Sequence, residues 1–135
     1  MPIERHLSPA GLATNPGYSH VVVASGPLLF VSGQVAFDAT GELVGPGDLA
    51  AQTRQVLANV EACLTEAGAG WTDVVKLGWY VQDATHVQTV RDVRDEVLGP
   101  VLQGRPMPAS TLIEVANLFR DDLLIEVDAV AALPG

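Results

Sequence analysis

The chain has 135 residues, of which 48% are hydrophobic and only 17% are charged, and its formal net charge is −9. This length suits one domain that buries about two-thirds of its unfolded surface, so we expect a single domain over residues 1–135. The negative charge and the seven scattered Lys and Arg residues argue against nucleic acid and against an anionic membrane as partners.

The first part of the chain is punctuated by Pro and Gly. Residues 1–17 predict an irregular N-terminal arm, because Pro and Gly recur there without periodicity. Two β-rich runs follow, at 18–24 and 28–32. The Ser-Gly-Pro sequence at 25–27 separates them and indicates a hairpin.

Helical periodicity dominates the middle of the chain. Apolar residues recur at spacings of three and four after Asp48 and stop at Gly68, which predicts an amphipathic helix. Residues 73–82 form a β-rich run. A second helical pattern covers 87–102, and we expect Pro100 to kink or break it.

The C-terminal part contains two apolar strands with carboxylates inside them, at 105–115 and 123–131. Such strands are normally buried on at least one face. The carboxylates of Glu114, Glu126 and Asp128 must therefore be exposed to solvent, paired with a cation or used in chemistry. Alternation along a strand places Glu126 and Asp128 on one face and the apolar residues between them on the other.

The order of elements predicts an α+β fold with a mixed β-sheet and both helices on one face. Two helices cannot cover both faces of such a sheet. The apolar composition and the uncovered face together favour an oligomer in which sheets pack against each other between subunits.

Glu126 is the best candidate for chemistry. A carboxylate in partly apolar surroundings has a raised pKa and can activate a water molecule near neutral pH. An ion pair with Lys or Arg across a subunit boundary is the alternative. Glu114 favours a structural hydrogen bond, and Tyr18 either presents its phenol to a pocket or packs at a strand entrance.

The remaining polar residues predict no metal site. Cys63 is the single cysteine. It lies on the apolar stripe of the first predicted helix, so we expect it to be a core residue. The three histidines form no spaced pair. The N-terminus lacks an apolar signal core, and no run approaches the roughly 18 apolar residues of a membrane span. We therefore expect a soluble, unprocessed, cytoplasmic protein.

Several segments in this order resemble the Rid family, also called YjgF and, in older usage, the L-PSP endoribonucleases. The similarity runs from about Tyr18 to Ala131. The segments that carry it are Phe30–Gln34, Gln52–Val60, Val74–Lys76, Tyr80–Asp83, the Pro108–Ala109 pair and Ile125–Ala131.

The resemblance implies a chorismate-mutase-like α+β subunit and a homotrimer whose sheets form a central barrel, with three clefts at the subunit interfaces. In the deaminase branch of the family, the cleft hydrolyses reactive imines or enamines to ammonia and a 2-keto acid, without a cofactor. Under this resemblance Glu126 matches the glutamate that positions water, Tyr18 a tyrosine of the cleft, and Gly33 a backbone position at its wall.

One substrate-binding position departs from the deaminase branch. An arginine that clamps the substrate carboxylate follows the Pro-Ala pair in that branch, and this chain has Ser110 there. A hydroxyl supplies neither the charge nor the planar fork of a guanidinium, so we expect a non-standard substrate. Arg91, which stands where the family has an asparagine, or Arg105 would return a cation to the cleft. The alternative is that Arg91 pairs with Asp92 or Asp95 on the helix surface and that Arg105 is solvated.

Two functions follow from the resemblance. The first is a small-molecule imine or enamine hydrolase in which Glu126 orients water while Tyr18, Gly33, Ser110 and Arg91 form the binding site. The second is a non-catalytic trimer that holds a metabolite in the same cleft. The net charge of −9 argues against ribonuclease activity.

Overall fold

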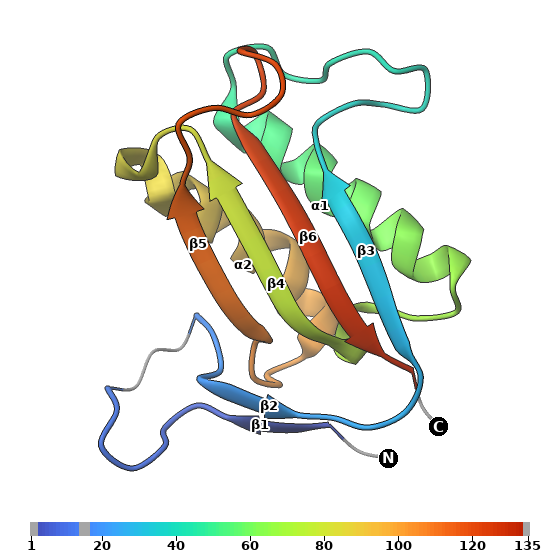
Figure 1. Ribbon diagram of the computed structural model, residues 1–135, viewed down its shortest axis with the longest axis vertical. Helices are drawn as coiled ribbons and strands as arrows, with labels where there is room; N and C mark the ends of the chain where they lie inside the picture. Colours follow the sequence, from blue (N-terminus) through green and yellow to red (C-terminus); the bar gives the residue numbers. More distant parts are fainter. Residues whose placement is uncertain (1–2, 14–16, 134–135) are drawn as a thin grey trace.

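A four-stranded mixed sheet forms the centre of the molecule, and the computed structural model describes residues 3–13 and 17–133. The strand order is β3-β6-β4-β5 (Figure 1). β6 pairs antiparallel with both β3 and β4, whereas β4 and β5 are parallel. The strands are β3 (Leu28–Gln34), β4 (Val74–Val81), β5 (Ala109–Glu114) and β6 (Ile125–Ala132).

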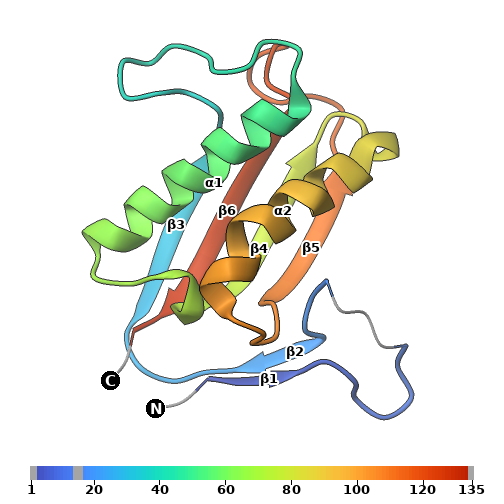
Figure 2. The ribbon, with the colours of Figure 1, turned by 180° about the vertical axis from the view of Figure 1, so that it is seen from behind.

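Both long helices cover the same face of this sheet, α1 (Leu49–Glu66) in front of β3 and β6 and α2 (Val87–Leu102) in front of β4 and β5 (Figure 2). Asp48 caps α1 by accepting a hydrogen bond from the backbone N–H of Ala51. Single 3-10 turns, η1 (Trp71–Asp73) and η2 (Ala84–His86), precede β4 and α2. Neither described helix combines the length and apolarity that a membrane span requires. The predicted α+β layout is confirmed.

Strand β6 shows why the sheet has one covered and one open face. Ile125, Val127 and Ala129 point toward the helices and are buried. Glu126 and Asp128 alternate with them and point to the face that carries no helix. The predicted division of this strand into an apolar and a carboxylate-bearing face is therefore confirmed.

The open face is apolar at both edges of the sheet. Phe30 on β3 pairs with Val130 of β6, and the residue is 74% exposed. Leu28 on β3 and Ile113 on β5 are exposed on the same face. This face, turned toward the viewer in Figure 1, carries no layer of its own chain. Apolar surface of this kind is typical of a protein interface.

The expected hairpin between residues 18–24 and 28–32 is wrong. Strand β2 (Val21–Val23) pairs with β1 (Glu4–His6) in a separate two-stranded sheet. The arm expected to be irregular thus contains a strand. The Ser-Gly-Pro segment at 25–27 is a corner between two sheets rather than a tight turn, because β3 takes β6 as its partner.

Pro100 does not break α2, contrary to the expectation from sequence. The helix continues to Leu102 and ends at Gln103, which has a φ of 50°. Pro100 lies in the last turn and is exposed, so the missing N–H removes one hydrogen bond at the end of the helix. Burial of Leu98 and Leu102 on either side holds this turn against the sheet.

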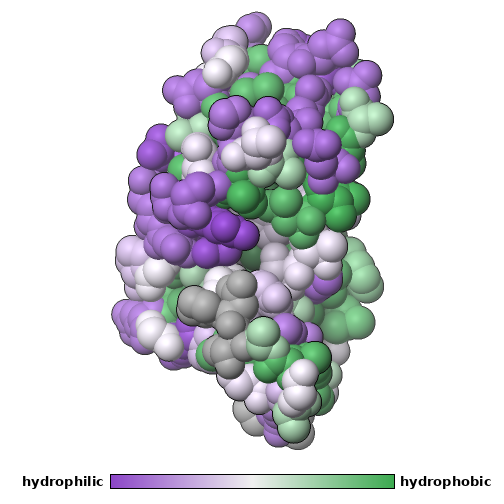
Figure 3. Space-filling model, turned by 90° about the vertical axis from the view of Figure 1, so that its left-hand side faces the viewer, coloured by the Kyte–Doolittle hydropathy of each residue, from purple (hydrophilic) through white to green (hydrophobic). Residues whose placement is uncertain are grey.

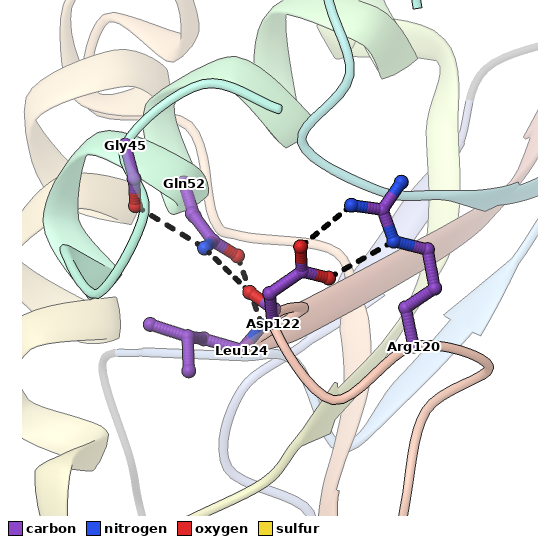
Figure 4. Close-up of polar contacts among 5 residues, drawn as sticks. All are labelled: Gly45, Gln52, Arg120, Asp122 and Leu124. Carbon is purple, nitrogen blue, oxygen red and sulfur yellow. Dashed lines mark hydrogen bonds and ion pairs between the residues drawn. The ribbon is translucent and has the colours of Figure 1, made fainter. Parts of the chain in front are cut away.

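A buried glutamine fixes the loop that leads into β6. The side-chain amide of Gln52 donates to the carbonyl oxygens of Gly45 and Asp122, at 3.2 and 3.0 Å, and its carbonyl accepts from the backbone N–H of Leu124 at 2.9 Å (Figure 4). Gln52 is fully buried on α1. The start of β6, and with it the position of Glu126, is therefore held by the first turn of α1.

Candidate active site

A cavity of about 430 Å³ opens at the β5 edge of the sheet. Figure 3 shows this side of the molecule, which is hollowed where hydrophilic and hydrophobic side chains meet. The cavity brings together three of the predicted binding residues, Tyr18, Arg91 and Ser110. Its full lining is Gly17, Tyr18, Trp79, Val87, Val90, Arg91, Arg94, Ser110 and Leu112.

Tyr18 reaches the cavity because the next residue, Ser19, is hydrogen-bonded to the segment that leads into β5, and β5 forms one wall of the cavity. The backbone N–H of Ser19 donates to the Pro108 carbonyl at 3.1 Å, and its hydroxyl donates to the Met107 carbonyl at 2.6 Å. Ser19 is 1% exposed. The Tyr18 ring also makes an edge contact with His20. The segment before β2 therefore forms a fixed wall beside the start of β5.

Ser110 is the second residue of β5 and faces α2. Its register partner on β4 is the buried Leu77, so both side chains point to the helix-covered face. The indole N–H of Trp79 donates to the Ser110 hydroxyl oxygen at 2.8 Å. Because that oxygen accepts from Trp79, the Ser110 O–H remains able to donate into the cavity.

The opposite wall carries two arginines of α2. Arg91 is exposed and makes no hydrogen bond or ion pair with any described residue, so the expected alternative of pairing with Asp92 or Asp95 is wrong. Arg94 lies one turn further along, and its Nε atom donates to Asp95 at 3.0 Å. Arg105 does not line the cavity.

Glu126 and Gly33 form a second group of predicted site residues, on the open face. Gly33 lies in a bulge of β3, between Val31 and Gln34 in the register with β6. A Cβ atom at Gly33 would collide with the Glu126 carboxylate, which lies against the glycine backbone. Only a residue without a side chain permits this approach.

The open face raises the pKa of Glu126. Partial burial is the larger cause, because it removes water from the charged carboxylate, and repulsion by the neighbouring Asp128 is the smaller one. Tyr80 donates its hydroxyl to Asp128 at 3.0 Å, which raises the pKa of Tyr80. Glu126 has no hydrogen-bond partner among the described residues and is free to bind a water molecule or a ligand.

The predicted site residues thus fall into two groups on opposite faces of one sheet. Tyr18, Arg91 and Ser110 line the cavity at the helix-covered face, while Gly33 and Glu126 meet on the open face. Within the described residues, no three His, Cys, Asp or Glu side chains are grouped to hold a metal ion. Glu114 accepts a hydrogen bond from the Ala84 N–H, as expected of a structural carboxylate.

Among the lining residues that the sequence analysis did not assign to the site, two can form hydrogen bonds through their side chains, Arg94 and Trp79. Arg94 follows Arg91 at the i, i+3 spacing that places two side chains on the same side of a helix, and that signal was available. Trp79 alternates with Leu77 and Val81 in a buried strand and looked like core. Its hydrogen bond to Ser110 depends on the parallel register of β4 and β5, which sequence patterns do not specify.

This architecture, two helices on one face of a mixed β3-β6-β4-β5 sheet, is that of the YjgF-type subunits. A Rid protein of unknown function from Yersinia pestis has a solved structure that matches with a TM-score of 0.85 and 39% identity, over 98% of this chain and 100% of that chain. The YjgF gene product of Escherichia coli matches with a TM-score of 0.71 and 31% identity, over 95% and 93%.

Sequence comparison agrees with the structural match. The profile of the family described as Endoribonuclease L-PSP matches residues 9–133. A 2-iminobutanoate/2-iminopropanoate deaminase of Escherichia coli is 36% identical over 107 residues, which are 78% of this chain and 80% of the relative. The chain belongs to this L-PSP family, also called the Rid or YjgF family, in agreement with the resemblance found in its sequence.

Proposed function

We propose that the protein is a cofactor-independent hydrolase that converts a small imine or enamine to a carbonyl compound and ammonia. The observation that carries this proposal is Glu126, a half-buried carboxylate with a raised pKa that lies against Gly33 and has no described partner. A carboxylate in this setting can hold a water molecule and accept its proton near neutral pH. The deaminase relative supports the reaction class.

Hydrolysis of an imine requires one group of the protein that accepts a proton from water and then donates it to nitrogen. The oxygen of water bonds to the carbon of the protonated C=N group while Glu126 takes a proton from that water, which gives a neutral carbinolamine. Glu126 then returns the proton to nitrogen. The C–N bond breaks, the carbonyl forms, and the hydroxyl proton leaves with ammonia as ammonium. Glu126 ends the cycle ionised, as it began.

We further propose that the complete site lies between subunits of a homotrimer. Glu126 and the cavity residues Tyr18 and Ser110 point to opposite faces of one chain, so a second copy must bring a carboxylate-bearing face to the cavity. The exposed Phe30 and Leu28 on that face support such contact. Each cleft would then take its water-binding group from one subunit and its binding wall from another.

The substrate of this hydrolase would differ from those of the deaminase branch. That branch grips its substrate with an arginine after the Pro-Ala pair, and here Ser110 offers one O–H beside Trp79. The ligand must therefore be oriented by other groups in the cavity.

The proposal is tested by measuring ammonia release from imines generated in situ by an amino-acid oxidase, with a panel of amino acids. Wild-type protein should accelerate ammonia release over the buffer reaction, and Glu126→Gln should lose at least about tenfold because it removes the proton acceptor. Glu114→Gln, which changes a carboxylate outside the site, is the matched control. Equal rates for wild type and Glu126→Gln would contradict the proposal.

A non-catalytic trimer that holds a metabolite is the second candidate. It is favoured by Ser110, because loss of the carboxylate-binding arginine removes a group that the deaminase branch uses on its substrate. In that case a ligand would bind to the cavity with the same affinity in wild type and Glu126→Gln, and neither protein would release ammonia.

A further inference from the structure

The open face of the sheet carries one ammonium group besides its two carboxylates. Among the described residues of the four strands, Lys76 of β4 is the single cation. Lys76 shares a face with Gly78, two positions further along β4, and a Cβ at Gly78 would meet the Asp128 carboxylate. The face that carries Glu126 and Asp128 therefore also carries the Lys76 amino group.

Lys76 does not pair with these carboxylates inside its own chain. Asp128 of β6 lies opposite Gly78, two residues from Lys76, so the two charged residues are diagonal neighbours. The Lys76 Nζ atom instead donates to the Thr111 hydroxyl oxygen of β5 at 2.8 Å. Because β4 separates β5 from β6, the exposed amino group is turned away from Asp128 (Figure 1).

The Asp128 carboxylate is held in place but its charge is not balanced. Its Oδ2 atom accepts from the Tyr80 hydroxyl at 3.0 Å, and its Oδ1 atom occupies the space that a Cβ at Gly78 would take. Tyr80 is a neutral donor. Within residues 3–13 and 17–133, no cation forms an ion pair with Asp128, and Oδ1 accepts no hydrogen bond.

We propose that Lys76 of one subunit forms an ion pair with Asp128 of the next subunit in the homotrimer. This inference rests on the homotrimer put forward with the proposed function and deepens it by naming a contact that holds the subunits together. Burial of the open face would remove both charges from water, and an unpaired buried charge strongly destabilises the state that contains it. The single cation of the strands, supplied by a second copy, meets this requirement.

A ring of three subunits suits this pair. In a ring, each chain uses two different surfaces, so every subunit would offer Lys76 to one neighbour and Asp128 to the other. The Lys76 amino group lies toward β5, and the cavity with Ser110 opens at the β5 edge. The ion pair and the shared cleft would thus both join the β5 side of one subunit to the β6 carboxylates of the next, and Glu126 stays free to bind water.

Sedimentation velocity of charge-reversed variants tests this ion pair. Lys76→Glu and Asp128→Lys should each raise the protein concentration needed for half-assembly by at least about tenfold over wild type, because like charges then meet across the interface. The double variant with both changes restores opposite charges and should assemble close to the wild-type concentration. Recovery in the double variant also shows that loss of assembly in the single variants is not a failure to fold.

Arg54→Glu is the control for Lys76→Glu, since it makes the same change of charge on α1, in the helix layer, and should leave assembly unaltered. Trimers that persist in both single variants, or a double variant that assembles no better than they do, would overturn the ion pair. A monomeric wild type would overturn it together with the homotrimer. Failure of the hydrolase alone looks different, because wild type and the double variant would then assemble without any release of ammonia, a result that supports the ion pair.

Discussion

The two carboxylates of β6 lie against glycines of the neighbouring strands. Gly33 of β3 leaves room for Glu126, and Gly78 of β4 leaves room for Asp128; a Cβ at either glycine would collide with the carboxylate beside it. Tyr80 then fixes Asp128 by a hydrogen bond. The sheet thus holds two negative charges side by side, which opposes ionisation of Glu126.

This arrangement predicts a pH-dependent gain in stability for Glu126→Gln. The pKa of Glu126 is higher in the folded than in the unfolded chain, so its contribution to stability is fully present below the unfolded pKa of about 4.3 and is lost as the pH rises through the folded pKa. A glutamine is neutral throughout. Relative to wild type, the variant should therefore gain stability between pH 4 and pH 7.

Urea unfolding at fixed protein concentration and at both pH values measures this difference. Glu114→Gln is the control, because Glu114 lies outside the carboxylate pair and bonds the Ala84 N–H. A stability difference between wild type and Glu126→Gln that is the same at pH 4 and pH 7 would contradict the raised pKa.

At the scale of elements, the position of β6 depends on its connection to α1. Gln52 satisfies two carbonyls and one N–H of the segments before α1 and β6 (Figure 4). The Arg120–Asp122 ion pair in the same loop is exposed and contributes little. One buried side chain therefore links the first turn of a helix to the strand that carries Glu126.

We expect Gln52→Met to destabilise the fold by about 3 kcal/mol, since it leaves three backbone groups of a buried site without their partner. Gln88→Met is the matched control: Gln88 is exposed and bonds only Asp92 one turn away, so its loss should cost about 0.5 kcal/mol or less. Urea unfolding of both variants checks the difference. Similar losses in the two would show that the Gln52 contacts do not support the loop.

Elements whose signals are local could be predicted from the sequence. The α1 boundaries follow from Asp48 as N-cap and from the glycines at 68 and 70, and the two faces of β6 follow from alternation. The pairing of β2 with β1 could not be predicted, because residues 7–20 separate the two strands in the sequence. The helix α2 continues past Pro100, because the burial of Leu98 and Leu102 stabilises the last turn by more than the one missing hydrogen bond costs.

The sequence names residues that the structure brings together in two groups, but it does not predict how those groups are arranged. Tyr18, Arg91 and Ser110 do share a cavity, and Glu126 does meet Gly33. Their division between opposite faces follows from strand register and from the way α2 packs on β5, both of which are tertiary properties. The same packing turns Arg94 toward the cavity, whereas helical periodicity alone would place Arg94 on a polar, solvent-facing helix surface.

At the scale of the whole molecule, the proposed function and the proposed homotrimer would both depend on the same open face. The carboxylates of β6 lie on this face between exposed apolar residues of the two edge strands, which are Leu28 and Phe30 on β3 and Ile113 on β5. Exposure of these apolar side chains to water does not stabilise a single chain. Burial of these side chains against a second copy contributes about 25 cal/mol for each Å² of apolar surface removed from water.

Phe30→Glu should therefore separate the homotrimer that we propose into single subunits of 14.2 kDa, because it places a charge in the apolar surface that the subunit contact would bury. Sedimentation velocity at micromolar concentration gives the mass. Val101→Glu, at an exposed valine on α2, is the control and should keep the wild-type mass. Ammonia release should fall with the mass, since a lone subunit keeps Glu126 and the cavity on opposite faces. A monomeric variant with full activity would contradict the shared cleft.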